Sequence, residues 1–258
     1  MGTEWDDTVE VIDVATAAWE QLSRRSVYRN RWIEVVAMTS EPVIPGALMV
    51  IAKAPIPGRV KTRLCPPLDC AGACRVARAC LLDTLDAAAA VPAQRHVLVF
   101  EGDPTGWCPP GWECIAQRGG FLGERLANAF QDVADAAVVI AMDTPQVSPA
   151  SLRFALRALG GAGGAGRAAF GPAQDGGFWA IGLPRGVDPT AVFTDVPMST
   201  GETGARQRER LVELGLEVIE LETLRDIDVI GDLRAVAEAA PDRRVAAVAR
   251  ALLTPTRT

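Results

Sequence analysis

Residues 47–64 read ALMVIAKAPIPGRVKTRL. The first six form a continuous apolar run, as a strand covered on both faces requires. A loop rich in proline and glycine follows, with a helical pattern after it, and the loop carries four cations: Lys53, Arg59, Lys61 and Arg63. Backbone N–H groups and cations between a strand and a helix make an anion site. The stretch therefore predicts an α/β fold with an anion site at one edge of its sheet.

The size and charge of the chain limit the classes of protein to consider. A length of 258 residues suits one large domain or two small ones, and 49% hydrophobic content is enough to bury a real core. The net charge of -6 argues against general binding to nucleic acid. The chain shows neither an apolar run of roughly 18 residues, the length of a membrane span, nor a signal peptide at its start. We therefore expect neither nucleic acid nor membrane as a partner.

The cysteines and the single histidine favour structural roles. The six cysteines form no CxxC pair, and a single histidine, His96, supplies too few ligands to complete a Cys/His zinc site. Free thiols are typical of cytoplasmic proteins, so a cytoplasmic location is expected. His96 opens an apolar run and has no positioned nucleophile beside it, so we interpret it as structural.

A change in composition divides the chain near residue 46. Residues 1–46 are rich in tryptophan and charge and end in TSEPVIPG, a stretch typical of a linker. We expect them to form an N-terminal extension, either docked or mobile. Residues 47–258 are expected to form one domain.

Strand and helix patterns alternate in this second part. The expected strands are residues 47–52, 95–100, 136–142, 168–171, 178–183 and 216–221. The expected helices are residues 74–90, 122–135, 148–159, 203–215, 231–240 and 243–253. Strands separated by helices predict a mostly parallel sheet with helices on both faces, a three-layer α/β/α sandwich. Ligands bind at the carboxyl ends of the strands in such sheets.

The cationic loop suits a polyphosphate better than a single carboxylate. Its framework of Pro55, Pro57 and Gly58 keeps it stiff and lets a ligand approach closely. The loop matches neither the Walker A pattern nor the dinucleotide-binding GxGxxG pattern. The alternative is that it is only a solvated surface loop.

Carboxylates stand at two further strand ends. Asp143 directly follows a buried apolar run, where a charge is costly unless it is used. It could bind Mg²⁺ beside phosphates, or it could be a turn residue. Near the end of the chain, the stretch RDIDVIGDL offers Asp226 or Asp228 as a second metal ligand. Asp232 is expected either to cap the last helices or to form an ion pair on the surface.

The stretch GPAQDGGFWAIGL, residues 171–183, contains a double glycine. Gly176 and Gly177 predict a tight turn that leaves its backbone bare for a ligand, and Asp175 precedes them. The alternative is a plain Asp-Gly hairpin, which has the same signature.

Taken together, these motifs resemble those of the DUF2064 family of GT-A-like, nucleotide-diphospho-sugar-transferase-like proteins. The chain is more distantly similar to the 2-phospholactate guanylyltransferases and the molybdenum-cofactor nucleotidylyltransferases. The resemblance runs from about Leu48 to Ala235. It rests on AKAPIPGRVKTRL, LGERL, MDTP, GPAQDGGFWAIGL, MST and DIDVIGDL, in the family order.

The resemblance implies a three-layer domain that binds a nucleotide and a divalent cation, Mg²⁺ or Mn²⁺. It implies metal ligation by Asp143 and Asp228, an acceptor-side turn at Asp175, Gly176 and Gly177, and a phosphate-binding loop with Lys53, Lys61 and Arg63. We further expect Ala52, Gly58 and Arg59 to contact the nucleotide phosphates, and Lys61, Asp143 and Asp175 to be catalytic.

The chain departs from the family pattern at three places. Ala141 and Met142 stand where the family has Gly-Thr before the metal aspartate, and Thr144 stands in place of cysteine. Phe178 replaces a tyrosine, and Met198 replaces a tryptophan. Contacts to the acceptor are therefore the least transferable part of the resemblance.

Three functions fit these features. The first is a nucleotidylyltransferase that joins an NTP to a phosphorylated or acidic small molecule and releases pyrophosphate. The second is a glycosyltransferase that uses an NDP-sugar, with Asp175 as base. The third is a degenerate nucleotide-binding module. The expected partners are a nucleotide and a small-molecule acceptor, and the oligomeric state is left open, with a homodimer as one alternative.

Overall fold

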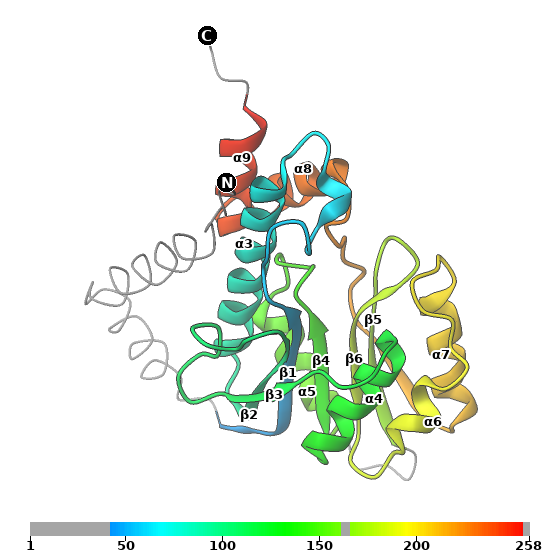
Figure 1. Cartoon of the computed structure of the whole chain (residues 1–258). Coiled ribbons are helices and arrows are strands. Elements are labelled where there is room, and N and C mark those ends of the chain that lie inside the picture. The colour runs from blue at the N-terminus through cyan, green and yellow to red at the C-terminus, as the bar shows by residue number, and fades with distance from the viewer. Residues whose placement is uncertain (1–41, 161–165, 255–258) are drawn as a thin grey trace, which may run out of the picture. The chain divides into compact units, whose positions relative to one another are not determined.

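The computed structural model describes residues 42–160 and 166–254 (Figure 1). The chain divides into two units, Met1–Pro42 and Val43–Thr258, and the helices and strands named here belong to the second unit. The predicted extension, residues 1–46, lies mostly outside the described residues.

A seven-stranded sheet forms the centre of the described chain, in the order β3-β2-β1-β4-β6-β5-β7. Its neighbouring strands pair in parallel, except that β6 runs antiparallel to both β4 and β5. The strands are β1 (Ile44–Lys53), β2 (Ala93–Glu101), β3 (Glu113–Ala116), β4 (Ala137–Ala141), β5 (Arg167–Pro172), β6 (Phe178–Leu183) and β7 (Glu217–Glu220). The predicted mostly parallel sheet is confirmed.

Helices cover both faces of this sheet. Those that pack on it are α3 (Cys70–Ala89), α4 (Leu122–Val133), α5 (Pro149–Ala158), α6 (Pro189–Phe193) and α7 (Thr203–Glu213). The described chain also contains α8 (Ile230–Ala239), α9 (Arg244–Leu253) and a short 3₁₀ helix, η1 (Thr62–Leu64). Within the described ranges, no helix is both long and apolar enough to span a bilayer.

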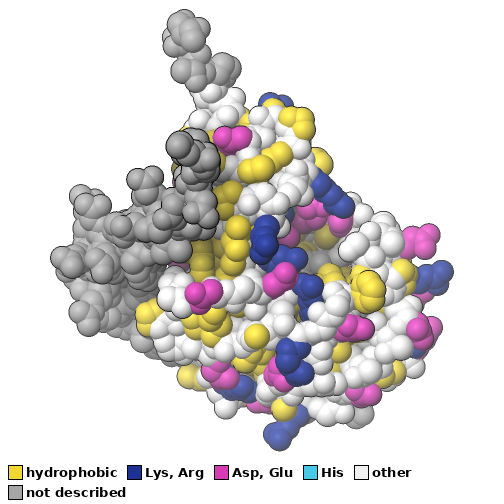
Figure 2. All heavy atoms as spheres, in the orientation of Figure 1, with side chains coloured by type: hydrophobic (Ala, Val, Ile, Leu, Met, Phe, Trp, Pro, Cys, Tyr) yellow, Lys and Arg dark blue, Asp and Glu magenta, His cyan; other side chains and the backbone are white. Residues whose placement is uncertain are grey.

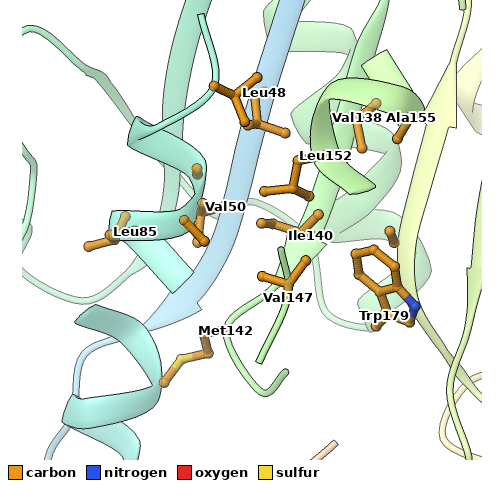
Figure 3. Close-up of a cluster of buried hydrophobic side chains, with 14 of the residues drawn as sticks. Leu48, Val50, Leu85, Val138, Ile140, Met142, Val147, Leu152, Ala155 and Trp179 are labelled. Atoms are coloured by element: carbon orange, nitrogen blue, oxygen red, sulfur yellow. The ribbon is translucent and has the colours of Figure 1, made fainter. Parts of the chain in front are cut away.

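The alternation of side chains along β1 explains the three layers. Leu48 and Val50 point to the face covered by α3 and α5, where Figure 3 shows Val50 near Leu85 and Leu48 on the side of Leu152. Met49 points to the opposite face, which α4, α6 and α7 cover. Because both faces are buried, the strand reads as a continuous apolar run. The predicted three-layer α/β/α sandwich is confirmed.

Several boundaries differ from the prediction. Strand β1 begins at Ile44, inside the stretch read as a linker, and α3 begins at Cys70, where the Asp69 side chain accepts a hydrogen bond from Gly72 N. Helices α8 and α9 pack outside α3 in a further apolar cluster that includes Leu233 and Val245. This cluster holds the loop before α8 close to the sheet edge.

Candidate active site

The order of the strands places the site. Strands β2 and β3 follow β1 on one side of it, and β4 then pairs with β1 on the other side. The sheet therefore has a topological switch point between β1 and β4. Ligands of open α/β sheets bind outside the carboxyl ends of the strands at such a point. Lys53 ends β1, Asp143 lies two residues beyond the end of β4, and Ile227 N donates a hydrogen bond to Asp143 O at 3.0 Å. Three loops thus meet at one edge.

A cavity of about 360 Å³ lies at this edge. It is lined by seven of the residues singled out from the sequence: Ala52, Lys53, Arg59, Lys61, Arg63, Asp143 and Asp228. Figure 2 shows Lys and Arg side chains beside Asp and Glu side chains around a hollow on this face. The fold therefore brings together residues that are up to 176 positions apart in the sequence, Ala52 and Asp228.

Lys61 has the most constrained position in the cavity. Its backbone is left-handed, with φ of 49°, and its side chain is only 7% exposed. The ammonium lies 2.7 Å from Asp143 Oδ1 and 3.8 Å from Asp228 Oδ1, and it donates to the Ile227 carbonyl. Burial lowers the pKa of this ammonium, but Asp143 above all, with help from Asp228, outweighs burial and raises it. Lys61 is therefore a buried, charged lysine.

Asp228 is held from both sides. Arg63 Nη1 donates to its Oδ2 at 2.6 Å. Its backbone N–H and that of Val229 donate to Asp232 Oδ2 at 3.2 and 2.9 Å, and Arg225 donates to the other oxygen of Asp232. Asp232 caps the start of α8, as predicted, and by doing so it also fixes the loop that carries Asp228.

Asp143 and Asp228 are the residues that could hold a divalent cation. Both present carboxylate oxygens to the same Lys61 ammonium, so they face a common point. Among the described residues there is no cluster of three or more acidic, histidine or cysteine side chains arranged for a metal. Two carboxylates, completed by water and substrate phosphates, are nevertheless what Mg²⁺ usually takes. The donor set fits a metal that binds together with a nucleotide.

The other end of the cavity contains residues that the sequence did not single out. Arg125 from α4 pairs with Glu101, which also accepts from Lys53 at 3.1 Å. Gln117 Nε2 donates to Ala52 O at 2.8 Å. Arg125 lies in the LGERL motif, which marked this segment in the sequence but did not indicate a role for the arginine.

The double glycine serves packing in this structure. Gly176 has φ of 90°, and a Cβ there would clash with the carbonyl of Gly201. Gly204 N donates to Gly176 O at 2.7 Å, and the Asp175 side chain accepts from Gly177 N at 2.8 Å. These residues connect the antiparallel strands β5 and β6, and they do not line the cavity. Their proposed acceptor role stays a prediction.

Gly58 and Asp226 lie beside the cavity. Gly58 has φ of 76° in the cationic loop, so its conformation requires glycine even though it does not line the cavity. Burial raises the pKa of the Asp226 carboxyl to about 6, and Asp175 and Asp228 add to the rise. Gln174 N donates to Leu224 O at 2.9 Å, which joins the turn at Asp175 to the segment that leads to Asp226.

Comparison with known proteins confirms the resemblance. Residues 76–200 match the family described as "Uncharacterized protein conserved in bacteria (DUF2064)". The match contains Asp143 and the Asp175–Gly177 turn, whereas the cationic loop and Asp228 lie outside it. No curated protein matches the chain.

Solved structures share the fold. A presumed nucleotide-diphospho-sugar transferase from Desulfovibrio desulfuricans G20 is 26% identical, with a TM-score of 0.71 over 81% of this chain and 95% of that chain. It confirms the predicted nucleotide-diphospho-sugar-transferase-like fold.

Two further structures are more distant. Rv0371c of Mycobacterium tuberculosis H37Rv, in complex with manganese, is 22% identical, with a TM-score of 0.45 over 77% of this chain and 100% of that chain. A CMP:2-keto-3-deoxy-manno-octonic acid synthetase with CTP is 14% identical, with a TM-score of 0.49 over 76% and 99%. These two likenesses are too weak to bear on the activity of this chain.

Proposed function

From the DUF2064 match and the cavity at the sheet edge, we propose that this chain is a metal-dependent transferase that binds a nucleotide donor. We further propose that it is a nucleotidylyltransferase, which joins an NTP to a phosphorylated or acidic small molecule and releases pyrophosphate. The position of the Lys61 ammonium, between Asp143 and Asp228 in a cavity lined by more cations, carries this proposal.

The cations suit the triphosphate of the donor. Lys61, Arg59 and Arg63 line the cavity from the loop after β1, and Lys53 and Arg125 line it from the other end. As the bond to the α-phosphate breaks, negative charge grows on the departing pyrophosphate. Positive groups that are already in place stabilise this charge without reorganisation.

Asp143 and Asp228 would hold Mg²⁺ or Mn²⁺ in this proposal. A bound ion of this kind supplies charge neutralisation on the donor phosphates. The two residues would also fix the direction from which the phosphates approach, because the backbone of Asp143 is bonded to Ile227 N and the Asp228 carboxylate to Arg63.

The reaction does not require a general base when the acceptor is a phosphate, because a phosphate is already ionised. The chain offers no histidine for that task. Its single histidine, His96 in β2, is bonded through its ring to the carbonyls of Ala88 and Val91. The small-molecule acceptor and a cytoplasmic location, which six free cysteines support, belong to the same proposal.

Glycosyl transfer from an NDP-sugar is the second candidate. The similar protein from Desulfovibrio desulfuricans G20 is described as a presumed nucleotide-diphospho-sugar transferase, and Asp175 could accept a proton from an acceptor hydroxyl. The number of cations favours nucleotidyl transfer, because a departing pyrophosphate carries more charge than a departing nucleoside diphosphate. A degenerate binding module would have no need for the Lys61–Asp143 pair.

A thermal-shift panel tests the proposal. The full chain is melted with each NTP and a set of NDP-sugars, with and without Mg²⁺. A ligand at about 100 times its Kd stabilises the folded chain by about 2.7 kcal/mol. We expect one NTP with Mg²⁺ to give the largest rise in Tm. A larger rise with an NDP-sugar would favour the second candidate, and no rise with any nucleotide would contradict both.

A further inference from the structure

Lys61 occupies the place between the two carboxylates that a metal would need. Its ammonium lies within 3.8 Å of both Asp143 and Asp228, and it is only 7% exposed. A divalent cation bound to the same two carboxylates would stand a few ångströms from this ammonium. Like charges at such a separation repel, and the burial of the Lys61 side chain leaves little water to screen its charge. Lys61 and a metal therefore compete for this carboxylate pair.

Lys61 cannot leave the pair without a new partner. A buried ammonium that loses its carboxylates costs several kcal/mol in desolvation. The backbone at Lys61 is held in its left-handed conformation at the start of η1, so the side chain has a fixed base within the cavity. The phosphates of a nucleotide would supply the negative charge that Lys61 gives up.

We infer that Lys61 acts as a built-in competitor of the metal, which makes the binding of metal and nucleotide cooperative. Without nucleotide, Lys61 neutralises the carboxylates and metal binds weakly. With nucleotide, Lys61 bonds to phosphate and the carboxylates accept the metal. This inference rests on the proposed function, and it describes how metal binding at the proposed site is controlled. By linkage, the nucleotide must tighten metal binding by the same factor by which metal tightens nucleotide binding.

The test is a titration of the full chain with Mn²⁺ alone, without nucleotide. We expect Lys61→Met to tighten Mn²⁺ binding at least about tenfold over the natural chain, since the competitor is removed. Lys61→Gln, which can still donate to the Ile227 carbonyl, should tighten Mn²⁺ binding as well. It keeps the test possible if Lys61→Met fails to fold. A cooperative melting curve checks the fold of each variant.

Arg63→Met is the matched control. It removes the same charge beside Asp228, but Arg63 is 73% exposed and is not among the groups that contact Asp143. Competition predicts a much smaller gain in Mn²⁺ affinity for Arg63→Met than for Lys61→Met. Equal gains would mean that removing any nearby positive charge raises the Mn²⁺ affinity, and this result would overturn the inference.

A second titration measures the coupling. Mn²⁺ is titrated in the presence of the NTP that gives the largest thermal shift. We expect the NTP to tighten Mn²⁺ binding to the natural chain at least about tenfold and to have much less effect on Lys61→Met. Unchanged coupling in the variant would overturn the inference and leave the proposed metal site standing. If no variant bound Mn²⁺, with or without an NTP, the metal site and the inference would both fail.

Discussion

At the scale of single residues, the cavity depends on one charge that is withdrawn from water, the Lys61 ammonium, and on the carboxylates that pair with it. Lys61 has three partners, Asp143, Asp228 and the Ile227 carbonyl. Leaving a buried donor or charge without its partner costs about 1–3 kcal/mol or more. The four groups therefore stabilise one another, and a substitution of one changes the energy of the others.

Asp143→Asn tests the role assigned to this carboxylate. The amide keeps the shape of the side chain but removes a charge that a hard cation requires, so Mg²⁺-dependent nucleotide binding should fall at least about tenfold while the fold persists. The thermal shift with NTP and Mg²⁺ measures this. Asp132→Asn, which affects only an exposed pair with Arg118, is the control. Unchanged Mg²⁺ dependence in Asp143→Asn would show that Asp143 is only a turn residue.

The sequence predicts some of these residues and not others for a physical reason. Lys61, Asp143 and Asp228 could be predicted because each lies in a loop expected at the carboxyl edge of the sheet. Arg125 and Gln117 could not, because only the packing of α4 on the sheet and the pairing of β3 with β2 decide which way they face. The glycine at 176 was predicted as a turn, but its contact with Gly201 depends on tertiary structure.

At the scale of elements, β2 is fastened to the end of α3 through His96. Its Nε2 lies 3.1 Å from Ala88 O and 3.0 Å from Val91 O, and its ring stacks on Trp112. Burial lowers the pKa of this imidazole below its ordinary value, although the two carbonyls oppose the shift. The folded chain thus prefers neutral His96.

The titration of His96 should therefore make the folded chain less stable as the pH is lowered. Below the ordinary pKa of about 6.5, the unfolded chain binds a proton that the folded chain resists, so the free energy of unfolding decreases as the pH drops. His96→Gln should remove this contribution and flatten the dependence of stability on pH between about 7 and 5. Urea unfolding at several pH values measures it. Parallel curves for the two chains would contradict the assignment.

Asp232 links the start of α8 to the site. Asp232→Ala removes the acceptor of two backbone N–H groups and should cost about 1 kcal/mol of stability. It should also weaken Mg²⁺-dependent nucleotide binding, since the Asp228 loop is released. Asp188→Ala removes a comparable cap, the acceptor of Thr190 N on α6, and is the matched control. Equal nucleotide binding in both variants would show that Asp232 serves the helix alone.

Elements were predictable where their patterns were long. Strands β1 and β4 are buried on both faces and gave clear apolar runs. Strand β3 has four residues, three of them exposed, so it left no pattern. Helix α6 has five residues, but Asp188 and Pro189 are a start signal that could have revealed it.

At the scale of the whole molecule, we predict that the segment before the sheet is dispensable for folding. A chain that begins at Met38 keeps all of β1, whose first residue, Ile44, is buried and donates its N–H to Pro92 O. It should melt cooperatively, near the Tm of the full chain, as calorimetry can show. Aggregation or loss of a single transition would mean that the first 37 residues belong to the core.

The most direct test of the account is the release of pyrophosphate by the full chain. Each of the four NTPs is supplied with Mg²⁺ and a panel of phosphorylated acids and sugars. Pyrophosphate should appear with one NTP, and Lys61→Ala should reduce the rate of its release by about 10²–10³, or roughly 3–4 kcal/mol, because Lys61 acts most strongly on charge that grows in the transition state. Arg167→Ala, which breaks only an exposed pair with Glu217, should leave the rate unchanged. Consumption of an NDP-sugar without pyrophosphate, at a rate that Lys61→Ala barely changes, would contradict the account.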